Sequence, residues 1–348
     1  MTIRWGVIGT GQHPDLKVVP AMMLAADTDV VAAYSRDIGR ARAFCLKHGI
    51  QRPYDSLEGL LADPDIDAVF ISSPNFLHGK HTIAAAAAGK HVLVEKPMAT
   101  SIQEANGMVR ACKENGVMLG VGFQLRHHPG HIKARELIRD GALGHVSLAQ
   151  AQWCTGVRGE LSPARRTGLR EWWEAPEMIG GAPMLMRTGV HILDLLQFLL
   201  DQPIVEVAAI TDGRSAGQPV ENSGVVSLRF EGGALGTVTY GRLIPDTSND
   251  ATVYGTDGRI SLSDTILERM GGEIQVVSDT VELNESYQQS LVALYQLQVE
   301  AFNRSLDGGE KFHASGEDGL SVVRVTNAII ESASTGQSVK IDPLARRV

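Results

Sequence analysis

The chain has 348 residues, a length that favours two domains of roughly 150 residues each. Hydrophobic residues make up 43% of the chain and charged residues 21%, values typical of a globular protein with a large core. The formal net charge is −8, and no stripe or arm of Lys and Arg residues stands out. We therefore expect no nucleic-acid partner.

The N-terminus and the cysteines indicate the compartment. The chain enters the apolar run IRWGVIG almost at once, without the basic leader and long apolar stretch of a signal peptide. Its longest run of small residues, IAAAAAG, is too short and too weakly apolar to cross a bilayer. Cys45, Cys112 and Cys154 share no metal-binding or redox spacing. We expect a cytoplasmic protein with no membrane segment.

The first part of the chain alternates short β-branched runs with helical patterns, which predicts a parallel sheet built from βαβ units. The near-continuous apolar runs DAVFIS and HVLVE indicate strands that are covered on both faces. The predicted strands are Ile3–Gly9, Val30–Tyr34, Ala68–Ser72, His91–Glu95 and Val117–Gly122. The predicted helices between them are Leu16–Ala26, Ile38–His48, His78–Ala88 and Ile102–Asn115.

After a predicted bridging helix, His131–Asp140, the pattern changes to alternating segments that predict an antiparallel sheet. Turn signals such as EGG and TDG separate several of these segments at hairpin distance. The segments are VSLAQAQW, VEVAAITD, GVVSLRFEGG, LGTVTYGRL, DATVYGTDGRISL and IQVVSDTV. Further helices are predicted at Val190–Leu200, Leu291–Ser305 and Asp318–Ser334, the last capped by Ser315 and Asp318. The fold class is therefore α/β, with a doubly wound domain in residues 1–122 and an α+β domain in residues 123–348.

The first predicted strand runs directly into GTGQHPDL and a helix. Gly9 and Gly11 occupy the first two glycine positions of a dinucleotide-binding motif, where they permit a tight turn and a close approach to a pyrophosphate. Pro14 replaces the third glycine and suits the first turn of a helix. The alternative is a generic strand-to-helix turn. The position of the motif at the start of a βαβ series favours cofactor binding.

The residues after the second predicted strand distinguish NADP from NAD. An acid at this strand end binds the ribose 2′-hydroxyl of NAD, whereas a hydroxyl and a guanidinium suit the 2′-phosphate of NADP. Ser35 and Arg36 stand at the strand end, and Arg40 follows one helical turn later. We expect NADP, with NAD as the alternative, in which Asp37 binds the ribose and Arg36 is merely solvated.

The third and fourth predicted strands end in SSPNFLHGKH and HVLVEKPMAT. Ligands of open α/β sheets bind at the carboxyl ends of the strands. Pro74 and Pro97 end these two strands and direct the neighbouring side chains toward that edge. Lys96 stands at the end of a buried strand and directly before a proline, so it is a candidate for ligand binding or chemistry.

Together these motifs resemble the glucose–fructose oxidoreductase/inositol dehydrogenase (Gfo/Idh/MocA) family. The resemblance rests on GTGxxxD, SSPNxxHxxxxxxAAxAGKHVLVEKP, GFQLRHHP, GGxxxxRxGVHxxDLL and SGEDGL, in this order along essentially the whole chain. RWGVIGTG, VVPAM and the SR after the second strand are similar to the branch of NADP-dependent sugar and anhydrosugar reductases. The resemblance implies a Rossmann domain, a second domain with a large open antiparallel sheet, and oxidation or reduction of a carbohydrate or polyol.

The resemblance also implies roles for individual residues. Lys96 would hold the reacting oxygen, and His191 would be the second acid/base group. The residues implied at the cofactor are Gly9, Thr10, Gly11, Gln12, His13, Ser35, Arg36, Arg40, Ser73, Pro74, Asn75, His78, Glu95, Lys96, Gln124 and Trp172. Those expected at the substrate are Gln124, His127, Trp153 and Arg187. Asn75 and His78 have an alternative role as caps of the helix that starts there.

Arg187 departs from the family pattern, because many members have an acid four residues before the histidine and form a Lys–Asp–His set. If residues 187–191 are helical, Arg187 and His191 lie on one face, and the positive charge favours a neutral imidazole that accepts a proton. Arg187 itself stays protonated and suits a carboxylate, a phosphate or a developing alkoxide. In the alternative, Gly189 turns Arg187 away to pair with an acid elsewhere. Trp173 is a second departure, since many members have arginine there.

The histidines of the HHPGH segment, His127, His128 and His131, resemble a metal cluster. Pro129 and Gly130 disturb the spacing, and no partner carboxylate or cysteine set is evident, so we expect no metal. A contact between one of these histidines and the substrate is an alternative to a structural role.

Aromatic residues and one acid near the histidine have both structural and functional interpretations. Trp153, Trp172 and Trp173 are suited to form an aromatic platform for a sugar, and core packing explains them equally well. Asp194, three residues after His191, is expected to be a helix-surface or packing acid rather than a third catalytic residue.

We therefore expect an NADP-preferring dehydrogenase or reductase that acts on a sugar, an anhydrosugar or a polyol. Oxidation of a carbinol carbon requires loss of the hydroxyl proton to a group that titrates near the working pH, and Lys96 and His191 are the candidates. The alternative is a non-catalytic dinucleotide-binding sugar sensor. Loss of the acid at Arg187 fits that alternative, and the presence of Lys96 and His191 argues against it. We expect a homodimer or homotetramer formed through the C-terminal sheet.

Overall fold

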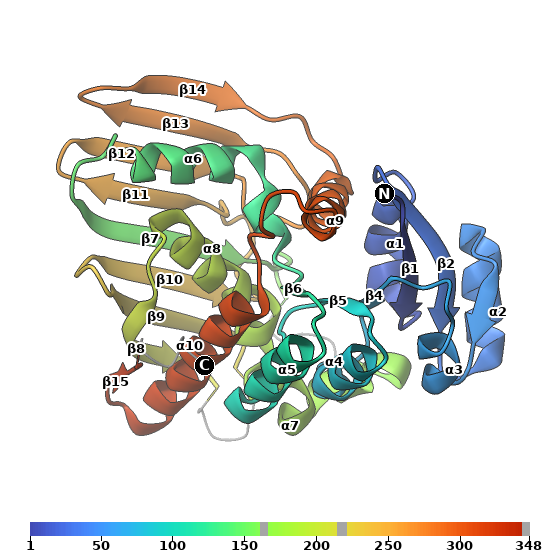
Figure 1. The fold of residues 1–348 in the computed structure, drawn as a ribbon. Coiled ribbons are helices and arrows are strands. Elements are labelled where there is room, and N and C mark those ends of the chain that lie inside the picture. Colours follow the sequence, from blue (N-terminus) through green and yellow to red (C-terminus); the bar gives the residue numbers. More distant parts are fainter. Residues whose placement is uncertain (161–165, 214–220, 343–348) are drawn as a thin grey trace. The chain divides into compact units, whose positions relative to one another are not determined.

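The computed structural model describes residues 1–160, 166–213 and 221–342 (Figure 1). The chain divides into two compact units. Unit 1 comprises Met1–Gln124 and Leu291–Leu320, and unit 2 comprises Leu125–Ser290 and Ser321–Val348. The return of the chain to unit 1 after residue 290 was not expected from the sequence. None of the described helices combines the length and apolar composition that a membrane span requires.

Unit 1 is built on a six-stranded sheet with the order β3-β2-β1-β4-β5-β6, in which every neighbouring pair is parallel. This order confirms the predicted doubly wound sheet. Because the winding reverses between β1 and β4, the carboxyl ends of these two strands form the point at which such sheets bind nucleotides. The strands are β1 (Ile3–Ile8), β2 (Thr28–Tyr34), β3 (Arg52–Tyr54), β4 (Ala68–Ile71), β5 (His91–Val94) and β6 (Leu119–Val121).

Helices of unit 1 cover a sheet whose central strands are buried. The helices are η1 (Pro14–Val18, a π-helix), α1 (Val19–Met22), α2 (Ile38–His48), α3 (Leu57–Leu61), η2 (Asn75–Leu77, a 3-10 helix), α4 (His78–Ala87), α5 (Ile102–Glu114) and α9 (Ala293–Leu306). The late helix α9 is anchored to β1, since the indole N–H of Trp5 donates to Asn303 at 3.2 Å. The Trp5 ring also packs on Phe302, with ring centroids 5.3 Å apart.

Unit 2 is built on a nine-stranded sheet with the order β14-β13-β12-β11-β7-β10-β9-β8-β15. The strands are β7 (Val146–Cys154), β8 (Ile204–Thr211), β9 (Ser223–Phe230), β10 (Leu235–Gly241), β11 (Ala251–Gly255), β12 (Gly258–Ser263), β13 (Glu273–Ser278), β14 (Glu282–Ser286) and β15 (Val339–Lys340). The pairing of β7 with β10 is parallel, and the other pairs are antiparallel. The predicted large antiparallel sheet is therefore present, with one parallel pair at its centre.

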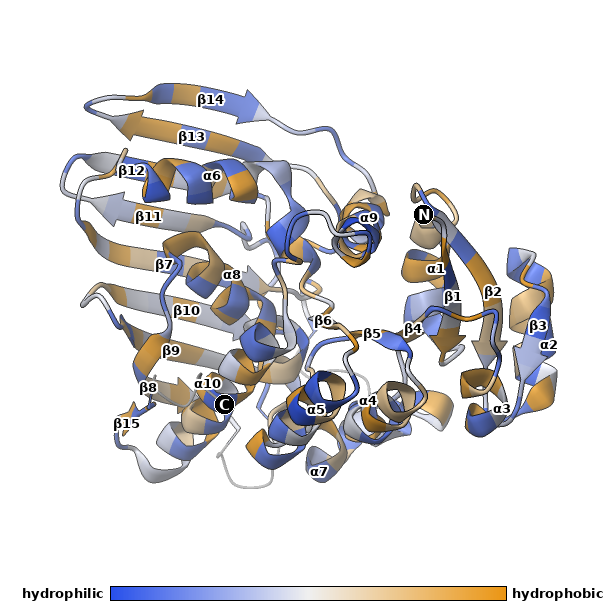
Figure 2. Cartoon of the chain, in the orientation of Figure 1, coloured by the Kyte–Doolittle hydropathy of each residue, from blue (hydrophilic) through white to orange (hydrophobic). Residues whose placement is uncertain are grey.

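The sheet of unit 2 carries its helices on one face (Figure 1). These are α6 (Pro129–Arg139), α8 (Val190–Leu200) and the unit 2 part of α10 (Gly316–Thr335). Shorter helical segments are η3 (Gln124–His127), η4 (Gly168–Glu174), α7 (Pro176–Ile179) and η5 (Leu185–Gly189, a π-helix). Side chains along β9 alternate accordingly, with Val226 and Leu228 buried and Val225 exposed. Figure 2 shows polar and apolar residues interleaved along the strands of this sheet.

A buried ion pair fixes α8 in unit 2. Asp194 is 1% exposed, and both of its carboxylate oxygens accept hydrogen bonds from the Arg126 guanidinium at 2.7–3.1 Å. Asp194 is therefore a packing acid, one of the two structural roles expected for it. Removing one partner of such a pair leaves a buried charge and costs about 3–5 kcal/mol of stability.

The ends of two predicted helices are set by side-chain caps. Ser315 and Asp318 cap α10 reciprocally, with Ser315 Oγ accepting from the Asp318 N–H at 3.3 Å and the Asp318 carboxylate accepting from the Ser315 N–H at 2.9 Å. This confirms the predicted cap. Helix α6 begins at Pro129, two residues before the predicted start, because His128 Nδ1 accepts the Gly130 N–H at 3.0 Å.

Candidate functional site

The turn after β1 has the geometry that a dinucleotide requires. Gly9 has φ of +114°, and a Cβ there would lie 2.7 Å from the carbonyl oxygen of Ser72, so only glycine fits between the ends of β1 and β4. A Cβ at Gly11 would meet nothing within 4 Å, which leaves open space beside the backbone. Pro14 is the first residue of η1, as predicted. The residues present therefore fit the pyrophosphate of a dinucleotide.

The end of β2 gathers the residues predicted at the 2′-phosphate. The Arg40 guanidinium donates to Ser35 Oγ at 3.4 Å, which places a hydroxyl beside a positive charge, and Arg36 is exposed next to them. The Asp37 carboxylate accepts the Arg40 backbone N–H at 2.9 Å and thereby caps α2. The acid that would bind the ribose of NAD is thus already engaged by the helix.

His78 joins the loops that follow β4 and β5. Its Nε2 lies 2.8 Å from the Ser73 carbonyl oxygen and its Nδ1 lies 2.9 Å from the Pro97 carbonyl oxygen. Burial lowers the pKa of His78, and a neutral imidazole donates its single N–H to one of these carbonyls at a time. The ring therefore ties the SSPN segment to the EKP segment. Neither η2 nor α4 has a side-chain cap, so His78 does not act as the helix cap considered above, and Asn75 follows the capping position of η2.

A second histidine holds the Ser73 side chain. His81, which was not predicted at the site, lies with Nδ1 3.0 Å from Ser73 Oγ. Burial lowers the pKa of His81 to about 4, so the ring is neutral at physiological pH. No motif singled out His81; its position one turn into α4 after His78 was the available signal.

Glu95, directly before Lys96, has a fixed charge environment. It is buried, and its Oε1 lies 2.9 Å from His13 Nε2 in the turn after β1. Burial alone would raise the pKa of the Glu95 carboxyl, but the positive charges of His13 and Lys96 outweigh it and lower the pKa. Lys96 itself is partly buried at the end of β5. Glu95 therefore connects the glycine turn to the strand end that carries Lys96.

The predicted cofactor residues of unit 1 lie at one edge of the parallel sheet. Thr10, Gln12 and His13 follow β1, and Pro74 follows β4. Gln124 follows β6 and is 1% exposed. Because carboxyl ends of parallel strands share an edge, the structure brings these predicted residues together.

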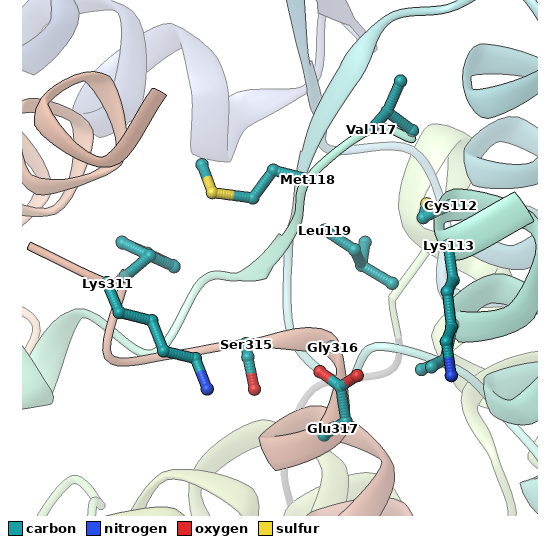
Figure 3. Close-up of a pocket in the computed structure, with 11 residues that line it drawn as sticks. Cys112, Lys113, Val117, Met118, Leu119, Lys311, Ser315, Gly316 and Glu317 are labelled. Carbon is teal, nitrogen blue, oxygen red and sulfur yellow. The ribbon is translucent and has the colours of Figure 1, made fainter. Parts of the chain in front are cut away.

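A cavity of about 270 Å³ lies elsewhere in unit 1 (Figure 3). Its lining consists of Val109, Cys112, Lys113, Val117, Met118, Leu119, Lys311, Phe312, Ser315, Gly316 and Glu317. Val117, Met118 and Leu119 lead into the amino end of β6. The cavity therefore belongs to the edge opposite the one where the predicted cofactor residues lie, and we assign it no role in cofactor binding.

Arg187 and His191 lie on one uninterrupted helical run in unit 2. Arg187 is in η5 and His191 is in α8, and Gly189 between them has helical angles, φ −57° and ψ −44°. The condition set for a shared face, that residues 187–191 are helical, is therefore met, although the first turn is a π-helix. Arg187 is partly buried and His191 is 2% exposed.

Trp153 supports His191. The indole lies at the end of β7, is 4% exposed and stacks on the His191 ring with centroids 4.8 Å apart. Tyr240 is the neighbour of Trp153 across the parallel pair of β7 and β10. A Cβ at Gly189 would lie 3.2 Å from the Tyr240 ring, so the small residue lets η5 approach β10. Trp153 thus packs against the predicted acid/base group.

Two other predicted aromatic residues and the histidine segment have defined places in unit 2. Trp172 lies in η4 and stacks on Trp173 at a centroid distance of 4.7 Å. His127 is buried in η3.

The two remaining histidines of the HHPGH segment have structural partners. His128 Nε2 lies 2.9 Å from the Gly271 carbonyl oxygen, and its Nδ1 accepts the N–H that starts α6. His131 contacts the Leu125 carbonyl and Thr265 Oγ1. Over the described residues no group of three or more His, Cys, Asp or Glu side chains is placed to share a metal ion.

Glu221 is a residue that the sequence did not single out. It is 4% exposed, and its Oε1 accepts the backbone N–H groups of Met184 and Leu185 at 2.8 and 2.9 Å. It therefore holds the start of the π-helix that carries Arg187. Burial raises the pKa of the Glu221 carboxyl to about 7. No local pattern predicts this contact, because Glu221 belongs to the segment that enters β9.

Comparison with protein families matches residues 3–123 to the model of the Gfo/Idh/MocA oxidoreductase family described as an NAD-binding Rossmann fold. Residues 135–341 match the C-terminal alpha/beta domain of the same family. Together these two matches cover most of the chain.

Similar proteins span the whole chain. It is 31% identical to the 1,5-anhydro-D-fructose reductase of Ensifer adhaerens, with 97% of this chain and 98% of that one covered. It is 32% identical to the D-xylose 1-dehydrogenase (NADP(+)) 2 of Haloferax volcanii, over 98% of this chain and 100% of that one. Its fold is similar to that of the aldose-aldose oxidoreductase of Caulobacter crescentus, with a TM-score of 0.85 at 23% identity over 98% and 100% of the two chains.

We predict that Glu221→Gln flattens the pH dependence of stability. Because the folded-state pKa of about 7 lies above the ordinary value of 4.5, the folded protein retains a proton that the unfolded chain loses. The free energy of unfolding of the wild type therefore falls by up to about 3 kcal/mol as pH rises through this window. The neutral amide does not incur this loss. Urea unfolding at about pH 5 and about pH 8 measures the difference, and parallel pH profiles would contradict the prediction.

Proposed function

Because the chain belongs to the Gfo/Idh/MocA oxidoreductase family, we propose that it is an NADP-dependent dehydrogenase or reductase that acts on a sugar, an anhydrosugar or a polyol. The observation that carries the proposal is the meeting of the glycine turn, the Ser35 end of β2 and the EKP end of β5 at one edge of the unit 1 sheet. This arrangement places Lys96 in the same part of the unit as the residues that fit a dinucleotide.

The relatives support a carbohydrate substrate. Two relatives that span the chain are named for the reduction of 1,5-anhydro-D-fructose and the oxidation of D-xylose. Both names describe two-electron chemistry at a carbon that carries oxygen. The same reaction type on a sugar, an anhydrosugar or a polyol is the proposal for this chain.

The end of β2 supports NADP over NAD. Ser35 and Arg40 are already hydrogen-bonded to each other, and Arg36 is exposed beside them. A hydroxyl with two guanidinium groups suits the doubly charged 2′-phosphate. One oxygen of the Asp37 carboxylate caps α2, and the preference for NADP rests on Ser35 and the two arginines.

The chain's own residues would bind the cofactor and move the proton. The backbone at Gly9 and Gly11 would hold the pyrophosphate, and Ser35 with its arginines would hold the 2′-phosphate. When bound, the nicotinamide supplies the redox chemistry by taking up or giving a hydride. Lys96 would bind and orient the reacting oxygen of the substrate through its ammonium group.

His191 is proposed as the group that exchanges the hydroxyl proton. Histidine is the side chain whose unperturbed titration lies near neutral pH. The stacked Trp153 ring and the buried position on α8 would hold the imidazole in one orientation. On oxidation His191 would take up the proton of the substrate hydroxyl, and on reduction it would return it.

The open face of the unit 2 sheet supports a homodimer or homotetramer. The exposed large apolar side chains on its strands are Ile210, Val225, Leu235, Tyr254 and Val277. The register places Ser227, Thr237 and Gln150 in one row across β9, β10 and β7, so the centre of the face is uncharged. Large apolar patches with uncharged centres are typical of protein–protein contacts.

The cysteines support the proposed cytoplasmic location. Cys45, Cys112 and Cys154 are all buried free thiols. Burial raises the pKa of Cys112 to about 12 and that of Cys154 to about 11, so neither is a reactive thiolate at neutral pH. Free thiols persist in reducing compartments, and the cytoplasm is the compartment we propose.

We predict that Lys96→Met abolishes turnover while NADP binding stays near normal, because the substitution removes the group that binds the reacting oxygen. Initial rates over a library of sugars and polyols measure turnover, and quenching of intrinsic fluorescence measures cofactor binding. Lys80→Met, at an exposed lysine of α4, is the matched control. Retained turnover in Lys96→Met would refute the assignment. Tight NADP binding by the wild type without turnover of any library member would favour the sensor alternative.

We predict that Arg36→Ala weakens NADP selectively. Loss of a charge-assisted contact to phosphate costs about 1.5–3 kcal/mol, which corresponds to a rise of about 10- to 100-fold in the KM for NADP with little change for NAD. Arg42→Ala removes an exposed arginine of the same helix, α2, and is the control. An equal change in KM for both cofactors would refute the role of Arg36.

We predict that Val225→Lys separates the oligomer into monomers of 37.4 kDa, because it places a charge on the apolar open face. Light scattering after size exclusion measures the mass of wild type and variant. Leu46→Lys introduces the same change at an exposed position of α2 and is expected to leave the mass unchanged. A monomeric wild type would contradict the proposed assembly.

A further inference from the structure

Four arginines from separate segments of unit 2 act on one another. Arg166 precedes η4, Arg170 lies in η4, Arg187 lies in η5 and Arg242 directly follows β10. The guanidinium of Arg166 lies over the Trp173 ring, 4.9 Å from its centroid. Arg242 is held by Asn222, whose side-chain oxygen accepts from Nε at 2.8 Å. These contacts give two of the four side chains defined positions.

The segments that carry Arg187 and Arg242 meet at the end of β10, since a Cβ at Gly189 of η5 would lie 3.2 Å from the Tyr240 ring and Arg242 directly follows β10. Trp153 ends β7 next to Tyr240 of β10, and the His191 ring stacks on Trp153. Arg187 is one helical turn before His191, and Arg242 is two residues after Tyr240. Arg187 and Arg242 are therefore the arginines that lie nearest, along their elements, to the strand end where Trp153 stacks on His191.

The four arginines carry like charges that lie close enough to affect one another. Burial first, and then the charges of Arg170 and Arg242, lower the pKa of Arg187. Burial, followed by Arg187 and the other two arginines, lowers the pKa of Arg166 to about 10. Because the positive charges of these arginines repel one another, binding of an anion among them would stabilise the cluster.

Acids near this end of the sheet are engaged by backbone N–H groups. Glu174 accepts the Arg166 N–H at 3.0 Å, and Asp212 accepts the N–H groups of Asn222 and Ser223 at 2.7 and 2.9 Å. Glu221 accepts two N–H groups at the start of η5, and its raised pKa of about 7 reduces its negative charge at neutral pH. These hydrogen bonds do not remove the charges of Glu174 and Asp212, and Glu174 offsets part of the lowering of the Arg166 pKa, but among these described side chains the four guanidinium groups outnumber the three acids.

We propose that Arg187, Arg170 and Arg242, with Arg166 beside them, form a subsite of unit 2 for an anionic group of the substrate. The subsite takes an oxyanion, a carboxylate or a phosphate, for which the planar guanidinium fork is suited. Resting on the proposed function, it makes the substrate an acidic sugar, a sugar acid or a sugar phosphate, rather than a neutral sugar.

The binding experiment uses the protein without cofactor and needs no turnover. Thermal unfolding is followed with inorganic phosphate, D-glucuronate or D-glucose at constant ionic strength. The proteins compared are the wild type, Arg170→Gln at an exposed position, and Arg187→Gln. Arg36→Ala is the matched control, since it removes the phosphate-binding arginine proposed in unit 1. Arg139→Gln, an exposed arginine of α6, controls for loss of charge alone.

Inorganic phosphate or D-glucuronate is expected to stabilise the wild type, Arg36→Ala and Arg139→Gln, with D-glucose at least about tenfold weaker. Each of Arg170→Gln and Arg187→Gln weakens binding of the anions by about 10- to 100-fold and leaves that of D-glucose unchanged. A response to phosphate alone assigns a phosphate site, and a response to D-glucuronate assigns a carboxylate site.

Two results would overturn the subsite. One is a wild type that neither anion stabilises more than D-glucose does, and the other is anion binding that survives in Arg170→Gln and Arg187→Gln. Initial rates with NADP on D-glucuronate, D-glucose 6-phosphate and D-glucose then separate the two proposals. Turnover of neutral sugars without arginine-dependent anion binding retains the oxidoreductase and removes the subsite. Arginine-dependent anion binding without turnover of any sugar retains the subsite and removes the proposed reaction.

Discussion

The contact between the ends of β1 and β4 is the constraint on which the candidate cofactor site depends. Gly9 allows the chain to turn with a positive φ while its Cα faces the Ser72 carbonyl at a distance that excludes any side chain. With the strand ends this close, His13 reaches Glu95 and the loop after β4 comes within reach of His78. The predicted cofactor residues that follow β1, β4 and β5 are thus held together by contacts within unit 1.

In unit 2 the corresponding constraint is the parallel pairing of β7 with β10. It sets Trp153 beside Tyr240, and the small Gly189 lets the helical run approach that pair. His191 is consequently held by packing, whereas Arg187 is held near other arginines by the hydrogen bonds that Glu221 makes to η5. Arg187, at the position where many family members have an acid, therefore lies among other basic side chains.

The parts of the fold that the sequence predicted are those with a strong local signal. Buried strands such as β4 and β5 are continuous apolar runs, and Ser315 and Asp318 mark the start of α10 by capping. The three-residue strand β3 is only partly buried and carries no period, so it was not predicted. The parallel pairing of β7 and β10 was missed because turn signals report only on strands that are neighbours in sequence. The roles of Glu221 and Arg242 were not predicted for the same reason, since they depend on how distant segments pair in the folded chain.

The return of residues 291–320 to unit 1 has a consequence for how the protein can be divided. The indole of Trp5 in β1 has its acceptor on α9, and the Asn303 amide also donates to the Asp27 carbonyl at 3.0 Å. A fragment that stops near residue 122 keeps all six parallel strands yet exposes a tryptophan and its apolar neighbours to water. Unit 1 therefore cannot be transferred to another protein as one continuous segment. A chimaera that preserves it must include both residues 1–124 and residues 291–320.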